Sequence, residues 1–203
     1  GRPDQDRAYV EMMQSMDSGI GRIVDRVRSM GLEDDTFIFF FSDNGPDGPG
    51  SSGPLRGRKA TVWEGGHRVP AIAYWPGRLP GGAVTDVPTM GMDLFPTLAA
   101  VAGVDLRPDL ALDGQNLLPV LGGAPSQPDR ALFWRHAGQK AARYGNWKLV
   151  LDPPDGPDIG LYDLEADIGE AQNLAGERPD LVAALRARLR DWEADVASGP
   201  MLT

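Results

Sequence analysis

The chain has 203 residues, a formal net charge of −9 at pH 7 and no cysteine. This length allows one substantial core, or one core with a small appendage, and the acidic balance argues against nonspecific nucleic-acid binding, which needs clustered positive charge. Without cysteine neither disulfides nor thiolate metal sites are available, and no apolar stretch approaches the roughly 18 to 20 residues that a membrane-spanning helix requires.

A long helix is predicted near the start of the chain, followed by a strand. Apolar residues recur at helical spacing from about Asp6 to Met30, and Gly31 is suited to end this helix. Five consecutive apolar residues close the segment 36–41, which predicts a central strand buried on both faces. A further strand is expected over residues 71–75, because Pro-Gly follows it as a turn signal.

Polar residues that suit a metal site follow the first strand at once. Asp43, Asn44 and Gly45 come directly after it, and carboxylate and amide oxygens are hard ligands that calcium and magnesium prefer. Open α/β sheets often carry ligand sites at the carboxyl ends of their strands. Asp43 and Asn44 are therefore candidate ligands of a divalent cation. The alternative is a tight turn, because Asn-Gly is the strongest two-residue hairpin signal.

A glycine- and proline-rich loop leads from these residues to a lysine. Residues 46–57 contain four glycines and three prolines, which is typical of loops, and Lys59 follows. An ammonium close to a bound cation suits an anionic substrate. The alternative for Lys59 is a solvated surface lysine without a role in chemistry.

The second half of the chain predicts one more core helix and then a small separate layer. A helix is expected over residues 93–102, with Gly103 after it. Short runs separated by turn residues predict a small antiparallel sheet, at 131–135, 140–143, 147–151 and 161–164. A terminal helix is indicated by Leu181, Leu185, Leu189, Trp192 and Val196. The domain boundary is expected near residue 125, which divides the chain into 1–125 and 126–203.

Several strings occur in the order typical of one protein family. They are Ser-Asp-Asn-Gly (42–45), Leu-Arg-Gly-Arg-Lys (55–59), Glu-Gly-Gly-His-Arg-Val-Pro (64–70), Asp-Leu-Phe-Pro-Thr-Leu (93–98), Trp-Lys-Leu (147–149) and Leu-Tyr-Asp-Leu (161–164). This order, over nearly the whole chain, resembles the second half of the formylglycine-dependent sulfatases, type I members of the alkaline phosphatase superfamily. Any one string could arise by chance, whereas the ordered combination could hardly do so.

The resemblance implies a fold and a set of site residues. The fold is α/β: residues 1–125 would be the C-terminal part of an alkaline-phosphatase-like sulfatase core, and 126–203 a small α+β subdomain with an antiparallel sheet and a C-terminal helix. Asp43 and Asn44 would complete a calcium site, or a magnesium site, begun by two aspartates nearer the N-terminus. Lys59 would be catalytic and would contact the sulfate, and His136 would reach the substrate from the small subdomain; the alternative for His136 is a structural histidine without a role in catalysis.

The resemblance also implies that the nucleophile lies outside this chain. The formylglycine of the family is expected only in the missing N-terminal half, so the chain alone would be inactive. Ser52 fits the Ser-x-Pro-x-Arg form of the nucleophile motif, but it follows Asp43 where the family motif precedes the metal ligand, and we reject it. Many family members are periplasmic or secreted, and residues 1–10 have no signal-peptide pattern.

The implied function is that of a sulfuric ester hydrolase. Its substrate would be a sulfate-ester small molecule or a sulfated carbohydrate. Two alternatives remain at this point. One is a noncatalytic module that associates with itself through exposed sheet edges or complements another chain. The other is a phosphatase or phosphonate hydrolase of the same superfamily. His67, within the string 64–70, is interpreted as structural and close to the site.

Overall fold

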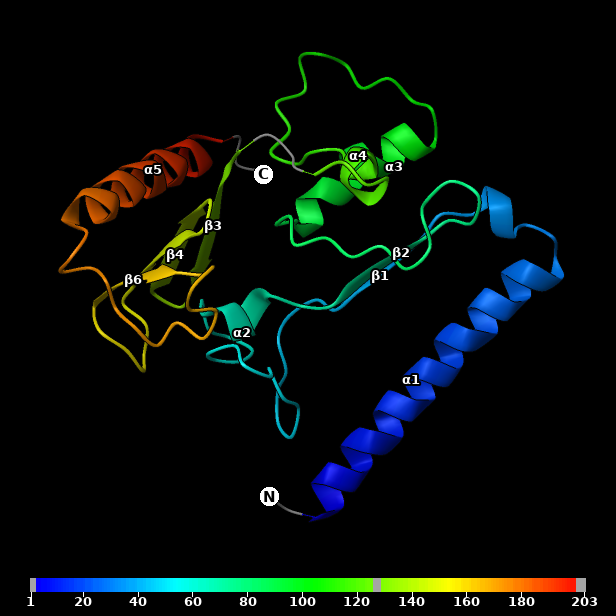
Figure 1. The fold of residues 1–203 in the computed structure, drawn as a ribbon, viewed down its shortest axis with the longest axis horizontal. Coiled ribbons are helices and arrows are strands. Elements are labelled where there is room, and N and C mark those ends of the chain that lie inside the picture. Colours follow the sequence, from blue (N-terminus) through cyan, green and yellow to red (C-terminus); the bar gives the residue numbers. More distant parts are fainter. Residues whose placement is uncertain (1–2, 126–128, 200–203) are drawn as a thin grey trace. The chain divides into compact units, whose positions relative to one another are not determined.

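The computed structural model describes residues 3–125 and 129–199 and divides the chain into two compact units (Figure 1). The first unit comprises residues 1–9, 42–70 and 129–203, and the second comprises residues 10–41 and 71–128. The domain boundary expected at residue 125 borders residues 126–128, which lie outside the described residues. That boundary therefore stays a prediction.

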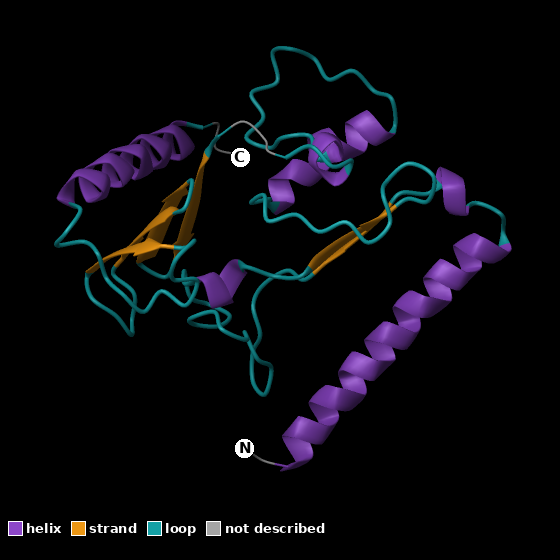
Figure 2. Ribbon diagram, in the orientation of Figure 1, coloured by secondary structure: helices purple, strands orange, loops and turns teal. Residues whose placement is uncertain are grey.

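The predicted first helix is confirmed. Helix α1 (Pro3–Ser29) is followed by Gly31 with φ of 68°, a left-handed conformation that glycine adopts without steric cost. A short 3₁₀ turn, η1 (Glu33–Asp35), leads into strand β1 (Ile38–Phe41). Strand β1 pairs antiparallel with β2 (Ala71–Tyr74), as Figure 2 shows.

Strand β1 is less buried than the sequence predicted. Its first three residues are half-buried, and the side chain of Phe41 is 41% exposed. Ile72 in the partner strand is 61% exposed. Among the described residues β1 pairs with β2 alone, and a two-stranded ribbon cannot cover both of its own faces. The expectation of a central strand buried on both faces is therefore wrong for this chain.

The remaining elements of the second unit are short. They are η2 (Gly91–Asp93), α3 (Leu94–Val101) and α4 (Leu118–Leu121). The carboxylate of Asp93 is buried and accepts hydrogen bonds from the backbone N–H groups of Met90, at 2.7 Å, and Gln115, at 2.8 Å. These bonds fix the start of α3 against the segment that precedes α4. The helix predicted over residues 93–102 is confirmed.

The first unit is built on a four-stranded antiparallel sheet. Its strands lie in the order β3 (Ala131–His136), β4 (Gln139–Tyr144), β5 (Trp147–Leu151) and β6 (Ile159–Asp163). Helix α5 (Pro179–Ser198) follows. The predicted small sheet and terminal helix are both confirmed.

The two faces of this sheet have different partners. Leu185 and Leu189 of α5 are buried against one face, where they pack with Leu149 of β5. The other face is covered by the segment that leads into the short helix α2 (Glu64–His67). Trp63, the last residue of that segment, is buried there in a hydrophobic cluster with side chains of the strands. Alternating side chains along each strand supply both clusters. Of the residues that the sequence singled out, His136 belongs to the α2 face, because it pairs with Gln139.

Within residues 3–125 and 129–199, no helix combines the length with the apolar composition that a membrane span requires.

Candidate functional site

Asp43 and Asn44 lie directly after β1, and their side chains point toward each other. Asn44 Nδ2 donates a hydrogen bond to Asp43 Oδ2 at 2.6 Å. The next residue, Gly45, is buried, and its N–H donates to the carbonyl oxygen of Gly66 at 2.9 Å. A Cβ at Gly45 would lie 1.8 Å from the carbonyl oxygen of Gly65, so only glycine fits there. The backbone after the predicted ligand pair is thereby fixed against α2.

The chemistry of this pair suits part of a hard-cation site. A carboxylate and an amide oxygen are ligands that calcium accepts, but calcium takes roughly six to eight oxygen ligands. Within residues 3–125 and 129–199 no group of three or more histidine, cysteine, aspartate or glutamate side chains could hold a metal ion. Asp43 and Asn44 therefore fit as two members of a larger ligand set.

The backbone of Lys59 is hydrogen-bonded to the segment that follows Asp43 and Asn44. Its N–H donates to the carbonyl oxygen of Pro46 at 3.1 Å, and its side chain is exposed. The residue after it, Ala60, has φ of 68°, which is uncommon for a residue with a Cβ. The turn that carries Lys59 is thus joined to the segment that follows Asn44, and the ammonium group extends into solvent.

His136 is brought to the same region by the β3–β4 hairpin. It lies opposite Gln139 in the strand register, and opposite residues of an antiparallel pair share a face of the sheet. The side-chain amide of Gln139 donates to the carbonyl oxygen of Ala60 at 3.1 Å and accepts from the N–H of Val62 at 3.2 Å. His136, which is exposed, therefore stands on the face of the sheet that carries the Lys59 turn.

The first unit also contains a buried ionic cluster, which we call the Lys148 cluster. Its members are Lys148, Glu64, Glu170 and His67. Lys148 Nζ lies 2.9 Å from Glu64 Oε1, 2.9 Å from Glu170 Oε1 and 3.2 Å from His67 Nε2. The second carboxylate oxygen of Glu170 accepts the N–H of Glu64 at 2.7 Å. The ammonium thus donates a hydrogen bond to Glu64 of α2, contacts His67 of the same helix and forms an ion pair with Glu170, so two separate segments of the chain surround it.

Burial and charge set the protonation states in the Lys148 cluster. Burial, together with the positive charge of Lys148, lowers the pKa of His67 to about 3. Burial acts to raise the pKa of Glu64, but Lys148 and other nearby charges outweigh it, so this pKa lies below its ordinary value. Burial raises the pKa of Glu170. His67 is therefore neutral at neutral pH, and with its proton on Nδ1 the ring accepts a hydrogen bond from Lys148 at Nε2.

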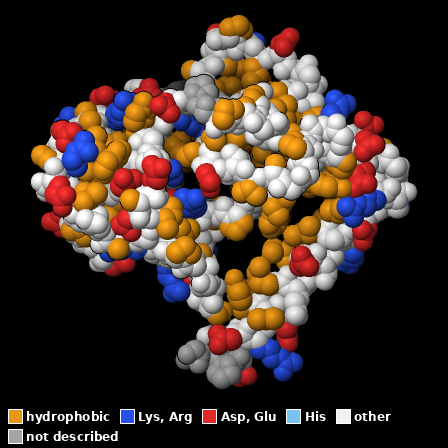
Figure 3. Space-filling view, viewed as in Figure 1, with side chains coloured by type: hydrophobic (Ala, Val, Ile, Leu, Met, Phe, Trp, Pro, Cys, Tyr) orange, Lys and Arg blue, Asp and Glu red, His pale blue; other side chains and the backbone are white. Residues whose placement is uncertain are grey.

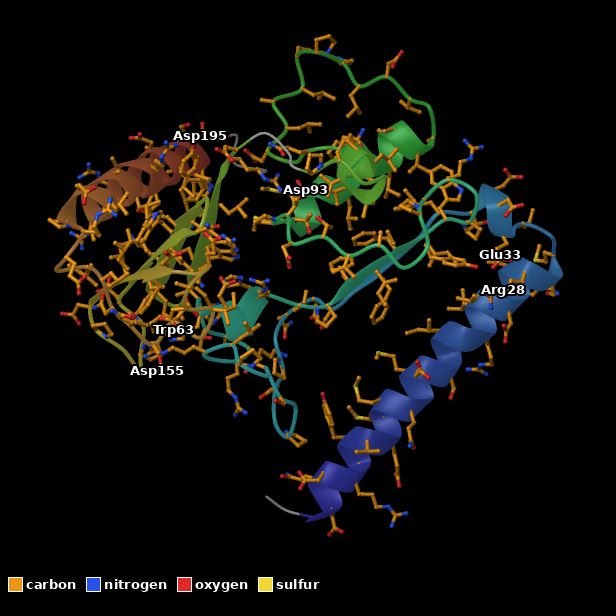
Figure 4. All side chains as sticks on the ribbon, viewed as in Figure 1. Arg28, Glu33, Trp63, Asp93, Asp155 and Asp195 are labelled. Atoms are coloured by element: carbon orange, nitrogen blue, oxygen red, sulfur yellow. The ribbon has the colours of Figure 1, made fainter. Side chains whose placement is uncertain are left out.

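Arg56, close to the Lys59 turn, is engaged inside the unit. Its guanidinium lies 3.7 Å from the ring centroid of Trp63 and donates to the carbonyl oxygens of Glu170 and Asp155. Trp63 Nε1 in turn donates to Asp155 Oδ1 at 2.7 Å (Figure 4). These contacts give Arg56 a structural role, because its donors are used in holding loops together.

Sequence reasoning did not single out the Lys148 cluster or Gln139. Lys148 stands in an apolar strand, where a lysine is usually taken to face solvent. Its partner Glu64 is 84 residues away in the sequence, and the pairing becomes visible only when the chain is folded. The one available signal was that Glu64 and Lys148 each belong to strings of the resemblance.

The chain is similar in sequence to sulfatases. A sequence model of the family described as Sulfatase matches residues 2–104. Arylsulfatase A of Bos taurus is 40% identical over 231 residues, which cover 95% of this chain and 45% of that protein. Steryl-sulfatase of Mus musculus is 35% identical over 238 residues, which cover 95% of this chain and 38% of that protein. The chain spans less than half the length of these curated relatives.

Solved structures of related proteins have the same fold. The crystal structure of Ps i-CgsB in complex with k-i-k-neocarrahexaose has a TM-score of 0.81 at 28% identity, and the match covers 91% of this chain and 42% of that one. Phosphonate monoester hydrolase of Agrobacterium radiobacter has a TM-score of 0.59 at 26% identity, with 87% of this chain and 40% of that one covered. The chain therefore belongs to the sulfatase family, within the alkaline phosphatase-like superfamily.

Proposed function

We propose that this chain is the C-terminal part of a type I sulfatase and that it supplies part of a calcium site and the sulfate-contacting lysine of a sulfuric ester hydrolase. The observation that carries the proposal is the bond from the N–H of Lys59 to the carbonyl oxygen of Pro46 at 3.1 Å. It joins the turn of Lys59 to the segment directly after Asp43 and Asn44. A cation site and a positively charged side chain on neighbouring turns suit a sulfate ester.

Each of these residues has a distinct role in the proposal. Asp43 and Asn44 would hold a calcium ion, or a magnesium ion, which when bound stabilises negative charge on sulfate oxygens. Lys59 would hold a sulfate oxygen with its ammonium and stabilise the charge that develops as the ester bond breaks. His136, on the same face of the sheet as the Lys59 turn, would contact the part of the substrate beyond the sulfate.

The nucleophile of this reaction lies outside the 203 residues in the proposal. A hydroxyl of the hydrated formylglycine in an N-terminal half would attack sulfur and release the alcohol of the ester, leaving a covalent sulfate ester on the enzyme, so the chain alone would not turn over substrate. A sulfated carbohydrate is the substrate class that we favour, because the related Ps i-CgsB structure is a complex with k-i-k-neocarrahexaose. A smaller sulfate ester is the other class that the same groups could bind.

Hydrolysis of an aryl sulfate by the complete sulfatase that contains this chain tests the role of Lys59. Lys59→Ala should lower kcat by at least about 10²-fold, the usual effect of removing one group that stabilises developing charge. Lys140→Ala is the matched control, because Lys140 pairs with Glu193 of α5 at 2.7 Å and not with the α2 face. Full activity of the Lys59 variant would exclude the assigned role.

A second candidate within the enzymes is a phosphonate or phosphate ester hydrolase. The likeness to phosphonate monoester hydrolase of Agrobacterium radiobacter favours it, although the TM-score of 0.59 is lower than the 0.81 of Ps i-CgsB. Rates of the complete enzyme on matched aryl sulfate and aryl phosphonate esters distinguish the two. A higher kcat/KM on the phosphonate would replace the sulfatase assignment.

A noncatalytic, self-associating module is a candidate of a different class. Large apolar side chains of the second unit are exposed, and hydrophobic side chains gather along α1 in Figure 3. Exposed apolar surface of this kind marks interaction sites in many proteins. Size-exclusion chromatography with light scattering tests this candidate, and a monomer at all concentrations would exclude self-association.

A further inference from the structure

The turn that carries Lys59 has an unfavourable backbone conformation. Ala60 has φ of 68°, in the left-handed region that disfavours residues with a Cβ. A residue in this region keeps its conformation only when its surroundings enforce it. Contacts with surrounding residues must therefore hold the Lys59–Val62 turn in place.

Gln139 is the side chain that spans this turn. Its Nε2 donates to the carbonyl oxygen of Ala60 at 3.1 Å, and its Oε1 accepts the N–H of Val62 at 3.2 Å. Gln139 is buried and begins β4, which pairs with β3 and β5 in the sheet. Both ends of one amide thus bind the two peptide groups that flank Thr61, the first of which belongs to the strained Ala60, from a rigid element.

The other hydrogen bonds of Lys59 and Thr61 are local, and besides Gln139 the side chain of Val62 packs on the sheet in the hydrophobic cluster of Trp63. Thr61 Oγ1 donates to the carbonyl oxygen of Arg58 at 2.7 Å, and the N–H of Thr61 donates to the same oxygen at 3.1 Å. The N–H of Lys59 donates to the carbonyl oxygen of Pro46, which is itself in a loop. These bonds tie loop to loop, whereas Gln139 ties the turn to the sheet.

We infer that Gln139 is a positioning residue for Lys59: it clamps the turn on either side of Thr61, directly after the strained Ala60, and thereby sets where the Lys59 ammonium meets the anionic group of the substrate. The inference rests on the proposed function for its consequence in catalysis. Gln139 itself is buried and acts through the backbone of the turn. His136, its partner in the strand register, would be held at a fixed place relative to the same turn.

Hydrogen–deuterium exchange of the 203-residue chain, resolved at the amides of the turn, tests the clamp. Gln139→Ala should speed exchange at Lys59, Thr61 and Val62 by about tenfold, the equilibrium change that corresponds to the loss of one hydrogen bond. Adding Ala60→Gly should return Lys59 and Thr61 to within about twofold of the wild type, because glycine needs no support at this φ. Val62 should stay fast, because its acceptor is gone.

Two matched controls separate the clamp from general loosening. Ala137 also has a positive φ, of 46°, in the adjacent hairpin, so Ala137→Gly should not rescue Gln139→Ala. Gln172→Ala removes an exposed glutamine of the same unit and should leave exchange in the turn unchanged. Unchanged exchange in Gln139→Ala, or an equal rescue by Ala137→Gly, would overturn the inference.

A second variant decides the matter if Gln139→Ala does not fold. Gln139→Glu keeps an acceptor for the N–H of Val62 and loses the donor to Ala60. It should leave Val62 protected and speed exchange at Lys59 and Thr61. Wild-type protection at all three amides would overturn the inference.

Activity of the complete sulfatase then separates this inference from the proposed function. Gln139→Ala should lower kcat/KM for an aryl sulfate by about tenfold, and Ala60→Gly should restore it. An inactive Lys59→Ala with normal exchange and activity in Gln139→Ala would overturn the clamp and leave the sulfatase proposal standing. A fully active Lys59→Ala with faster exchange in Gln139→Ala would overturn the sulfatase role of Lys59 instead.

Discussion

Lys148 Nζ lies 2.9 Å from Glu64 Oε1, and both side chains are removed from solvent, with exposed fractions of 0% and 1%. The pair joins β5 to α2, and Glu170 joins the region after β6 to both. Gly45, directly after the predicted ligand pair, is bonded to α2 through Gly66. The Lys148 cluster therefore supports the local structure from which Asp43 and Asn44 extend.

Removing the buried cation should destabilise the first unit. Lys148→Met is expected to lower the free energy of unfolding by about 3 to 5 kcal/mol, because Glu64 and Glu170 would stay buried without the cation that they share. Chemical denaturation measures the change. Lys140→Met is the control: its pair with Glu193 is 33% and 23% exposed, and its loss should cost less than about 1 kcal/mol. Equal losses in the two variants would contradict the role of the cluster.

His67 should make stability depend on pH. Its pKa is about 3 in the folded protein, against an ordinary value of 6.5. Between these values the unfolded chain binds a proton that the folded chain does not, so stability falls as the pH drops from 6.5 toward 3. One such group contributes at most about 1.4 kcal/mol per pH unit.

The variant His67→Phe isolates this contribution. Its ring can still stack on Trp134, whose centroid lies 4.2 Å from that of His67. The charged groups that face His67, namely Glu64, Lys148 and Arg143, are present in both proteins. The free energy of unfolding of the variant should therefore fall less steeply in this pH range. Parallel pH curves would show that His67 does not titrate as described.

Close packing at Gly45 should make this position intolerant of a side chain. Gly45→Ala is expected to lower the free energy of unfolding by about 1 to 3 kcal/mol, because the added Cβ would overlap the carbonyl oxygen of Gly65. Gly176→Ala is the control in the same unit, since a Cβ there would have no neighbour within 4 Å. Similar denaturation midpoints for both variants would contradict the close approach.

The helices α1, α3 and α5, the small sheet and the family were predictable from the sequence, whereas the burial of β1 and the Lys148 cluster were not. Apolar periodicity predicted α1 and α5 because each helix carries a stripe of apolar side chains at helical spacing. The run of five apolar residues at the end of segment 36–41 predicted a buried strand at β1. The burial of a strand depends on its neighbouring strands, however, and the run does not specify those neighbours. The short helix α2 was missed because its four residues include two glycines.

The candidate site was predictable only as separate residues. Asp43, Asn44, Lys59 and His136 each stood out by type and motif. Their connection through Gly45 and Gln139 depends on contacts between segments that are distant in the sequence. The side chain of Gln139, for example, binds the carbonyl oxygen of Ala60, which is 79 residues away. Residue patterns carry no direct signal for such a contact.

His136 should affect substrate binding more than chemistry. In the complete enzyme, His136→Ala is expected to raise KM for a sulfated oligosaccharide by about tenfold, the loss of one or two hydrogen bonds, and to leave kcat nearly unchanged. Arg135→Ala is the control, because neighbouring residues of a strand face opposite sides of the sheet. An unchanged KM for His136→Ala, or an equal rise for Arg135→Ala, would remove His136 from the substrate site.

The calcium dependence of aryl sulfate hydrolysis by the complete enzyme tests the central claim most directly. Asp43→Ala and Asn44→Ala should each raise the calcium concentration for half-maximal kcat/KM by at least about tenfold, because each removes an oxygen ligand. Asp47→Ala is the control, since Asp47 Oδ1 accepts the N–H of Gly48 in the same loop. Calcium curves of both variants that superimpose on the wild type would contradict the claim that these two residues share a cation.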